Sequence, residues 1–129
     1  MPGESDLATL LASLSPELLP GEFVMATVAA GIAASLPAHA VIREAEGVTV
    51  VLAREDADAA GLVYDFVARW ITLTVHSSLD AVGMTAAFAA ALTREGISCN
   101  VLAGFFHDHL LVPADRADDA VRALRALAA

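Results

Sequence analysis

The residues best suited to chemistry lie together in the segment His107-Asp108-His109. Alternate side chains of a strand lie on the same face of a sheet, so the two imidazoles could bind one metal ion. A third ligand would have to come from elsewhere in the chain, for example His76. Because Asp108 is also typical of a tight turn, a turn between two strands explains the same residues. We expect the turn, and a small metalloenzyme built on these three histidines is one alternative.

Other signatures of catalysis are absent from the sequence. No nucleophile motif accompanies the histidines, which argues against acid–base catalysis by His and Asp. No glycine-rich phosphate-binding loop occurs in the 129 residues, so nucleotide-dependent chemistry has no support. The single cysteine, Cys99, has no cation or helix start beside it in the sequence, and we expect it to be a small buried side chain. The sequence therefore predicts a protein that is not an enzyme and carries no cofactor.

A second candidate site is the segment from Ser77 to Gly83, which joins a predicted strand to a long predicted helix. The first N–H groups of a helix have no partner within the helix and lie at the positive end of its dipole, so they attract a carboxylate. The α-carboxylate of an amino acid is one such group. Capping of the helix by Ser78 or Asp80 explains the same residues without a ligand, and both interpretations stay open.

Composition excludes several classes of partner. The chain is 57% hydrophobic and 18% charged, which is not typical of a disordered protein. The longest weakly polar run, residues 23–36, is shorter than the roughly 20 residues that a membrane span needs. The seven basic residues, all Arg, face sixteen acidic ones for a net charge of −9, so we expect no binding to nucleic acid or to anionic membranes. With no signal-like N-terminus, the expected location is the cytoplasm.

Hydrophobic periodicity predicts a chain of alternating helices and strands. Helices are predicted at residues 6–14, 55–60 and 78–95 and after Pro113. Strands are predicted at residues 22–28, 42–44, 48–52, 71–75, 97–106 and 109–112, with a short helix or loop at 29–37. Ser5 or Asp6 is expected to cap the first helix, and Gly96 to end the long helix of the second half.

An internal repeat appears when these elements are aligned. Residues 51–60 parallel residues 111–120, because each segment is the end of a hairpin that leads into an acidic, Ala-rich helix. The strand at 22–28 likewise parallels the one at 69–75, and the first copy is shorter between this strand and its hairpin. Units of this size do not each bury an adequate core. We therefore expect an α+β sandwich in which the two copies pack side by side and share strands.

The second copy resembles an ACT domain. The resemblance rests on the segments Ile71–Gly83, Glu95–Gly104 and His109–Asp115, which follow a β-α-β-β-α-β pattern with a Gly after the first strand and a Val-Pro-Ala-Asp helix start. It is closest to small bacterial tandem ACT proteins, and more distant from the regulatory part of aspartokinases and from eukaryotic arginine-sensing ACT proteins. The resemblance implies tandem ferredoxin-like domains: a truncated copy with a leading helix over residues 1–62, and a complete copy over residues 63–129.

ACT domains of this kind are usually regulatory modules that bind amino acids at interfaces between domains or subunits. In the family arrangement the strand with Cys99 and Asn100 faces the loop before the long helix. The ligand-binding residues implied in this way are Ser77, Ser78, Asp80, Val82, Gly83, Met84, Cys99 and Asn100. The loop Ser78-Leu79-Asp80-Ala81-Val82-Gly83 departs from the common Asp-x-Pro-Gly pattern, which affects the identity of the ligand more than the fold.

The expected function is therefore regulatory. A small-molecule ligand, an amino acid, would bias the packing of domains or subunits, and exposed sheet edges predict a homodimer. The alternative from another class is a ligand-free assembly module whose sheet edge pairs with another protein.

Overall fold

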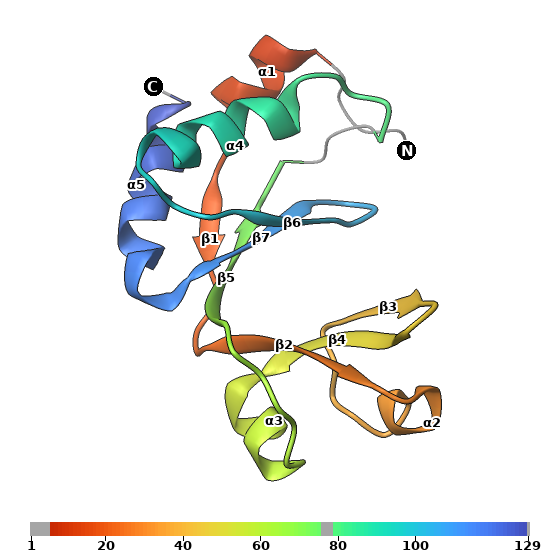
Figure 1. Cartoon of the computed structure of the whole chain (residues 1–129). Helices are drawn as coiled ribbons and strands as arrows, with labels where there is room; N and C mark the ends of the chain where they lie inside the picture. The colour runs from red at the N-terminus through yellow and green to blue at the C-terminus, as the bar shows by residue number, and fades with distance from the viewer. Residues whose placement is uncertain (1–5, 76–78, 129) are drawn as a thin grey trace. The chain divides into compact units, whose positions relative to one another are not determined.

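The computed structural model describes residues 6–75 and 79–128, and its contacts divide the chain into two compact units (Figure 1). Unit 1 combines Met1–Pro20 with Arg69–Ala129, and unit 2 is Gly21–Ala68. Unit 2 is thus an insertion in the sequence of unit 1. This division differs from the predicted boundary between residues 62 and 63, because the N-terminal helix and strand pack with the C-terminal copy.

Unit 1 has the element order of a βαββαβ domain, with its fourth strand taken from the N-terminal segment. Its elements are α1 (Leu7–Ala12), β1 (Pro16–Leu18), β5 (Val67–Leu73), α4 (Met84–Arg94), β6 (Asn100–Ala103), β7 (Asp108–Pro113), the 3-10 helix Ala114–Arg116 and α5 (Ala117–Ala126). The strand order is β1-β5-β7-β6. Strand β1 runs antiparallel to β5 with Glu17 opposite Thr72, a pairing between residues far apart in the sequence.

The core of unit 1 lies between its helices and one face of its sheet. The fully buried side chains of this cluster include Leu10, Ile71, Leu73, Phe88, Leu92, Leu110, Val112 and Leu124. Leu10 belongs to α1, so the N-terminal helix is part of this core. Helix α5 buries Ala117, Ala120, Val121 and Leu124, which confirms the apolar face expected from its periodicity.

Two predicted boundaries in unit 1 are wrong. The long helix begins at Met84 instead of residue 78, and its N-cap is Gly83 with φ +95°, a left-handed conformation that glycine adopts without strain. The turn of the last hairpin is residues 104–107 and not His107-Asp108, because β7 already begins at Asp108. Gly104 is required in this turn, since a Cβ there would lie 2.8 Å from the carbonyl oxygen of His107.

The helix ends of unit 1 largely follow the sequence. The Asp6 carboxylate accepts hydrogen bonds of 3.0 Å from the backbone N–H of Thr9 and 2.7 Å from its hydroxyl, so Asp6 caps α1 as predicted. Gly96, with φ +69°, follows α4 and ends it.

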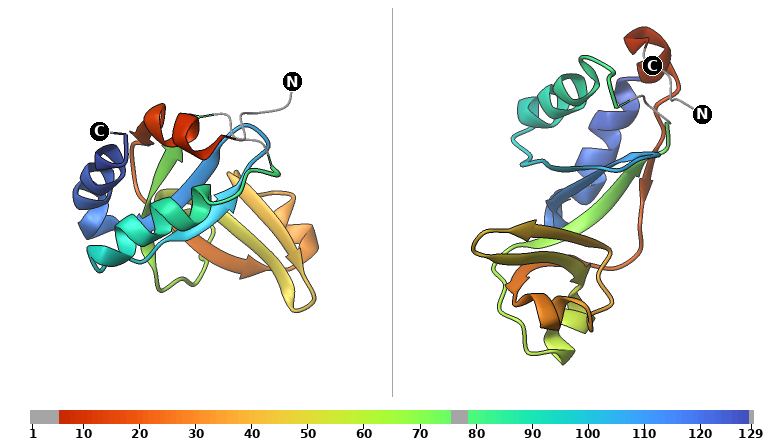
Figure 2. Two further views of the ribbon diagram at one scale, coloured as in Figure 1. Left: turned by 90° about the horizontal axis from the view of Figure 1, so that it is seen from above. Right: turned by 90° about the vertical axis from the view of Figure 1, so that its right-hand side faces the viewer.

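Unit 2 repeats the same plan on a smaller scale. Its elements are β2 (Phe23–Val28), α2 (Ala30–Ala33), β3 (Ala40–Glu44), β4 (Gly47–Ala53) and α3 (Arg54–Ala59). The strand order β3-β4-β2 is completed by the first residues of β5, with Ala68 opposite Phe23. Both helices pack on one face of this sheet, over Val24, Val50 and Leu52 (Figure 2). Helix α2 has four residues where α4 has eleven, so the first copy is truncated as predicted.

The helices of the described residues are short. Helix α4, with eleven residues, is the longest, and none is long and apolar enough to cross a membrane.

Replacing Leu10 by Ala should destabilise unit 1 by about 2–5 kcal/mol, because Leu10 is fully buried among side chains of the C-terminal copy. Chemical denaturation followed by fluorescence of Trp70, the only tryptophan and a residue of unit 1, measures this loss. Leu79→Ala is the matched control, since Leu79 is 70% exposed and its loss should change the free energy of unfolding by less than about 0.5 kcal/mol. Equal effects of the two substitutions would contradict the place of α1 in the core.

Candidate functional site

The turn before α4 is exposed on one side and held against α1 on the other. Leu79 and Val82 are 70% and 83% exposed, and Asp80 is also exposed. A Cβ built at Gly83 would lie 3.0 Å from Cδ2 of Leu7, so this glycine lies close against the first helix. A side chain at residue 83 would therefore meet both a positive φ and a close neighbour.

The N-cap of helix α4 is Gly83, which has no side chain to form a capping hydrogen bond. The N-cap position predicted at Ser78 or Asp80 is therefore occupied by Gly83 instead. The carbonyl of Gly83 accepts a 2.9 Å bond from the N–H of Ala87, whereas the N–H groups of the first helical turn have no acceptor within the helix. Ser77 and Ser78, the other predicted residues of this loop, lie outside the described residues.

The remaining predicted site residues face different ways. Met84 is 3% exposed and its side chain belongs to the core of unit 1. Cys99 is half-buried and also packs against that core, and burial raises the pKa of its thiol, as fits an unreactive side chain. Asn100 is exposed, and it lies on the opposite face of β6 from Val101, which packs against the core. Asp80, Val82, Gly83 and Asn100 are thus the described residues of the predicted site that a ligand could reach.

The histidine segment forms contacts on the face of the unit 1 sheet that points away from the unit 1 core. The Trp70 indole N–H donates a 3.0 Å hydrogen bond to Oγ1 of Thr72, which lies 3.0 Å from Nδ1 of His109. The Trp70 and His109 rings are 5.2 Å apart. This network explains why Thr72 is only 8% exposed, where strict alternation along the strand predicts a solvent-facing residue.

Burial shifts the pKa values of His109 and Asp108. The pKa of His109 lies below its ordinary value of 6.5, first because burial disfavours the imidazolium and then because of the charge of His107, while Asp108 opposes both. The pKa of Asp108 lies above 3.8 because burial disfavours its carboxylate. No group of three His, Cys, Asp or Glu residues among residues 6–75 and 79–128 is placed to hold a metal. His76, the third ligand of the metalloenzyme alternative, lies outside these ranges.

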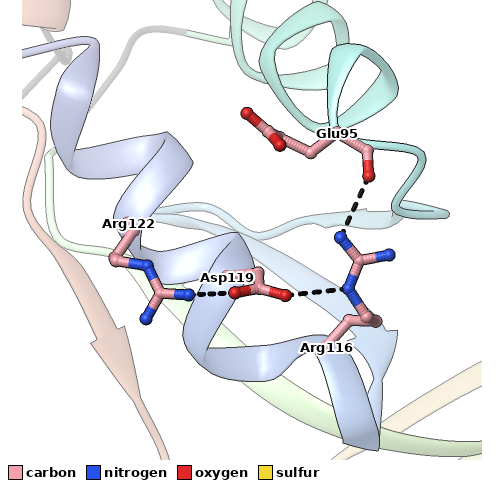
Figure 3. Close-up of polar contacts among 4 residues, drawn as sticks. All are labelled: Glu95, Arg116, Asp119 and Arg122. Carbon is pink, nitrogen blue, oxygen red and sulfur yellow. Dashed lines mark hydrogen bonds and ion pairs between the residues drawn. The ribbon is translucent and has the colours of Figure 1, made fainter.

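An arginine–carboxylate cluster joins the end of α4 to the start of α5 (Figure 3). Arg116 donates from Nε to Oδ2 of Asp119 at 2.9 Å and from Nη2 to the backbone carbonyl of Glu95 at 3.0 Å. Arg122 pairs with the other oxygen of Asp119. A cation at the carbonyl end of a helix is favourable, so this cluster fastens the two helices together. The i,i+3 spacing around Asp119 is the sequence signal for it.

Two family models identify the family of this chain. One ACT domain model matches residues 2–69 and a second matches residues 65–126. No curated protein matches the chain. The structure is similar to that of a Vibrio cholerae protein of unknown function described as a possible transport protein, with 47% identity, 95% of this chain and 96% of that chain covered, and a TM-score of 0.87.

More distant structures share the fold. An Agrobacterium tumefaciens protein is 19% identical over 89% of each chain, with a TM-score of 0.69. The ligand-free regulatory subunit of aspartate kinase from Thermus thermophilus is 12% identical, covers 89% of this chain and 97% of that chain, and has a TM-score of 0.67. With two ACT models that together span residues 2–126 and a 47% identical structure over almost the whole length, the chain belongs to the ACT family and contains two ACT domains in tandem.

Proposed function

We propose that this protein is a cytoplasmic regulator that binds an amino acid and responds by a change in the packing of its domains or subunits. The two ACT domains support a regulatory, amino-acid-binding type of role and point away from catalysis. The observation that carries the proposal is the start of α4. This eleven-residue helix opens at a glycine, which has no side chain to occupy the helix end, and the exposed turn at residues 79–82 lies next to it.

The chemistry of this helix end suits the α-carboxylate of an amino acid. The first N–H groups of α4 and the positive end of its dipole favour an anion, and Gly83 leaves room for it on the solvent side. Asp80, in the same turn, supplies a negative charge for the α-ammonium group. Met84 contributes through its backbone, since its side chain lies in the core. The proposed site also includes Ser77, Ser78, Val82, Cys99 and Asn100.

A route from this site to the rest of unit 1 passes through α1. Gly83 lies against Leu7, and Leu10 of the same helix is buried in the core. A ligand that shifts the turn would therefore favour one packing of α1 over another, which is a population shift. In unit 2 the outer strand β3 exposes 54% of Val41 and 43% of Ile42, an edge suited to pairing with a second copy in a homodimer.

A thermal-shift screen against the twenty amino acids at millimolar concentration tests the proposal. A ligand at about 100 times its Kd should add roughly 2.7 kcal/mol of stability. For a chain of this size the Tm should rise by about 2–8 °C. Asp80→Ala should reduce the shift, because it removes the partner of the ammonium group.

The matched control is Asp65→Ala, which removes an exposed carboxylate from unit 2 and should leave the shift unchanged. If no amino acid changes the Tm while the molar mass rises with protein concentration, the ligand-free assembly module is the better description.

The histidine segment should make folding pH-dependent. Because the pKa of His109 is lowered on folding, the unfolded state binds more protons below about pH 6.5, so stability should be complete above that pH and fall as the pH decreases. The raised pKa of Asp108 has the opposite effect on stability, and at lower pH. Its contribution to the free energy of unfolding is complete below about pH 3.8 and is lost as the pH rises through the raised pKa.

His109→Gln keeps a hydrogen-bonding group opposite Thr72 and removes the titration. Urea unfolding between about pH 7 and pH 5 should show a smaller loss of stability for this variant than for the wild type. Parallel curves for the two proteins would show that His109 does not titrate across folding as its burial implies.

A further inference from the structure

A groove of about 580 Å³ lies in unit 2 between α2 and the outer strands of its sheet. Its apolar walls are Ala30, Ala33, Ala34, Val41 and Val48. Arg43 and Glu44 also line it, toward the hairpin end of β3. The volume falls within the roughly 300–1,000 Å³ that small-molecule sites occupy, and a mostly apolar wall with a few polar groups is their usual composition.

The groove exists because α2 is short. In unit 1 the longer helix α4 places the fully buried side chains of Phe88 and Leu92 over the sheet. Helix α2 ends at Ala33, seven residues shorter (eleven minus four), and it carries only small side chains on this side. Val41 consequently stays 54% exposed, although it lies on the same sheet face as the unit 2 core.

The charged groups of the groove determine what could bind there. Arg43 lies opposite Val48, so its side chain is on the groove face of the sheet. Within the described residues Arg43 forms no hydrogen bond or ion pair. Its guanidinium can therefore donate two parallel hydrogen bonds to a ligand carboxylate. The Glu44 side chain alternates to the other face of β3, where its carboxylate accepts a hydrogen bond from the Thr49 hydroxyl. A second carboxylate on a ligand would therefore lie against the apolar wall, which is unfavourable.

We propose that this groove binds a small aliphatic monocarboxylate. The alkyl part lies against Ala33, Ala34 and Val41, and the carboxylate pairs with Arg43. This site is separate from the turn before α4, belongs to the other unit and needs no ammonium group on the ligand. It therefore does not depend on the amino-acid site proposed above.

Titration of the full-length protein with isocaproate, followed by amide NMR, tests the proposal. Saturable shifts are expected at α2 and β3. Arg43→Gln should weaken binding by at least about tenfold, the loss of one charged hydrogen-bonding contact. Ala34→Leu should weaken it similarly by filling the groove, since Ala34 is exposed and lies just after α2. Isoamylamine, with a similar alkyl part and a cation, and glutarate, with two carboxylates, should each bind at least about tenfold more weakly.

Arg94→Gln is the control for loss of one positive charge, because Arg94 is an exposed arginine at the end of α4 in unit 1. It should leave isocaproate binding unchanged, as should Asp80→Ala. Equal binding by the Arg43→Gln and wild-type proteins, or equal binding of isoamylamine, would overturn the proposal. Isocaproate shifts centred on residues 79–84 would also overturn it, by placing the carboxylate at the start of α4 instead.

Discussion

The pairing of β1 with β5 is the constraint on which the rest of the molecule depends. Unit 1 takes its fourth strand from residues 16–18, on the far side of unit 2 in the sequence. The connection is reinforced where the Leu19 N–H donates to the carbonyl of Trp70 at 2.9 Å and Arg69 donates to the carbonyl of Leu19, also at 2.9 Å. Because loop closure costs entropy, this long-range pairing must be stabilised by burial, which Leu10 of α1 and Leu14 just after the helix supply.

The difference between the two units follows from one helix. The same strand order serves both, but α4 covers its sheet with large side chains while α2 presents alanines. Unit 1 therefore has the more extensive core, and its candidate ligand site lies on the surface, at the start of α4 and the turn before it. Unit 2 instead keeps an apolar groove beside its outer strand. Truncation of a repeat thus changes where a ligand could bind without changing the fold.

Most elements could be predicted from the sequence because they depend on local pattern. Helix α5 and the strands around residues 22–28 and 48–52 have clear periodicity, and the ACT resemblance gave their order. The membership of residues 1–20 in unit 1 was not predictable, since β1 has only three residues and its partner lies about fifty residues away. The burial of Thr72 was missed for a similar reason, because His109 contacts it from the neighbouring strand β7, 37 residues away in the sequence.

The candidate site illustrates the same limit at the level of single residues. The sequence located a turn before a long helix, but the helix start at Gly83 depends on a positive φ and on contact with Leu7 from a distant segment. The contact with Leu7 determines what a ligand at this helix end could affect. A helix end surrounded by solvent would attract an anion without affecting the rest of the unit. The start of α4 instead packs against α1, and Leu10 of α1 lies in the core. A ligand bound at this turn, as proposed above, would therefore alter the stability of the N-terminal segment, which is what regulation by packing requires.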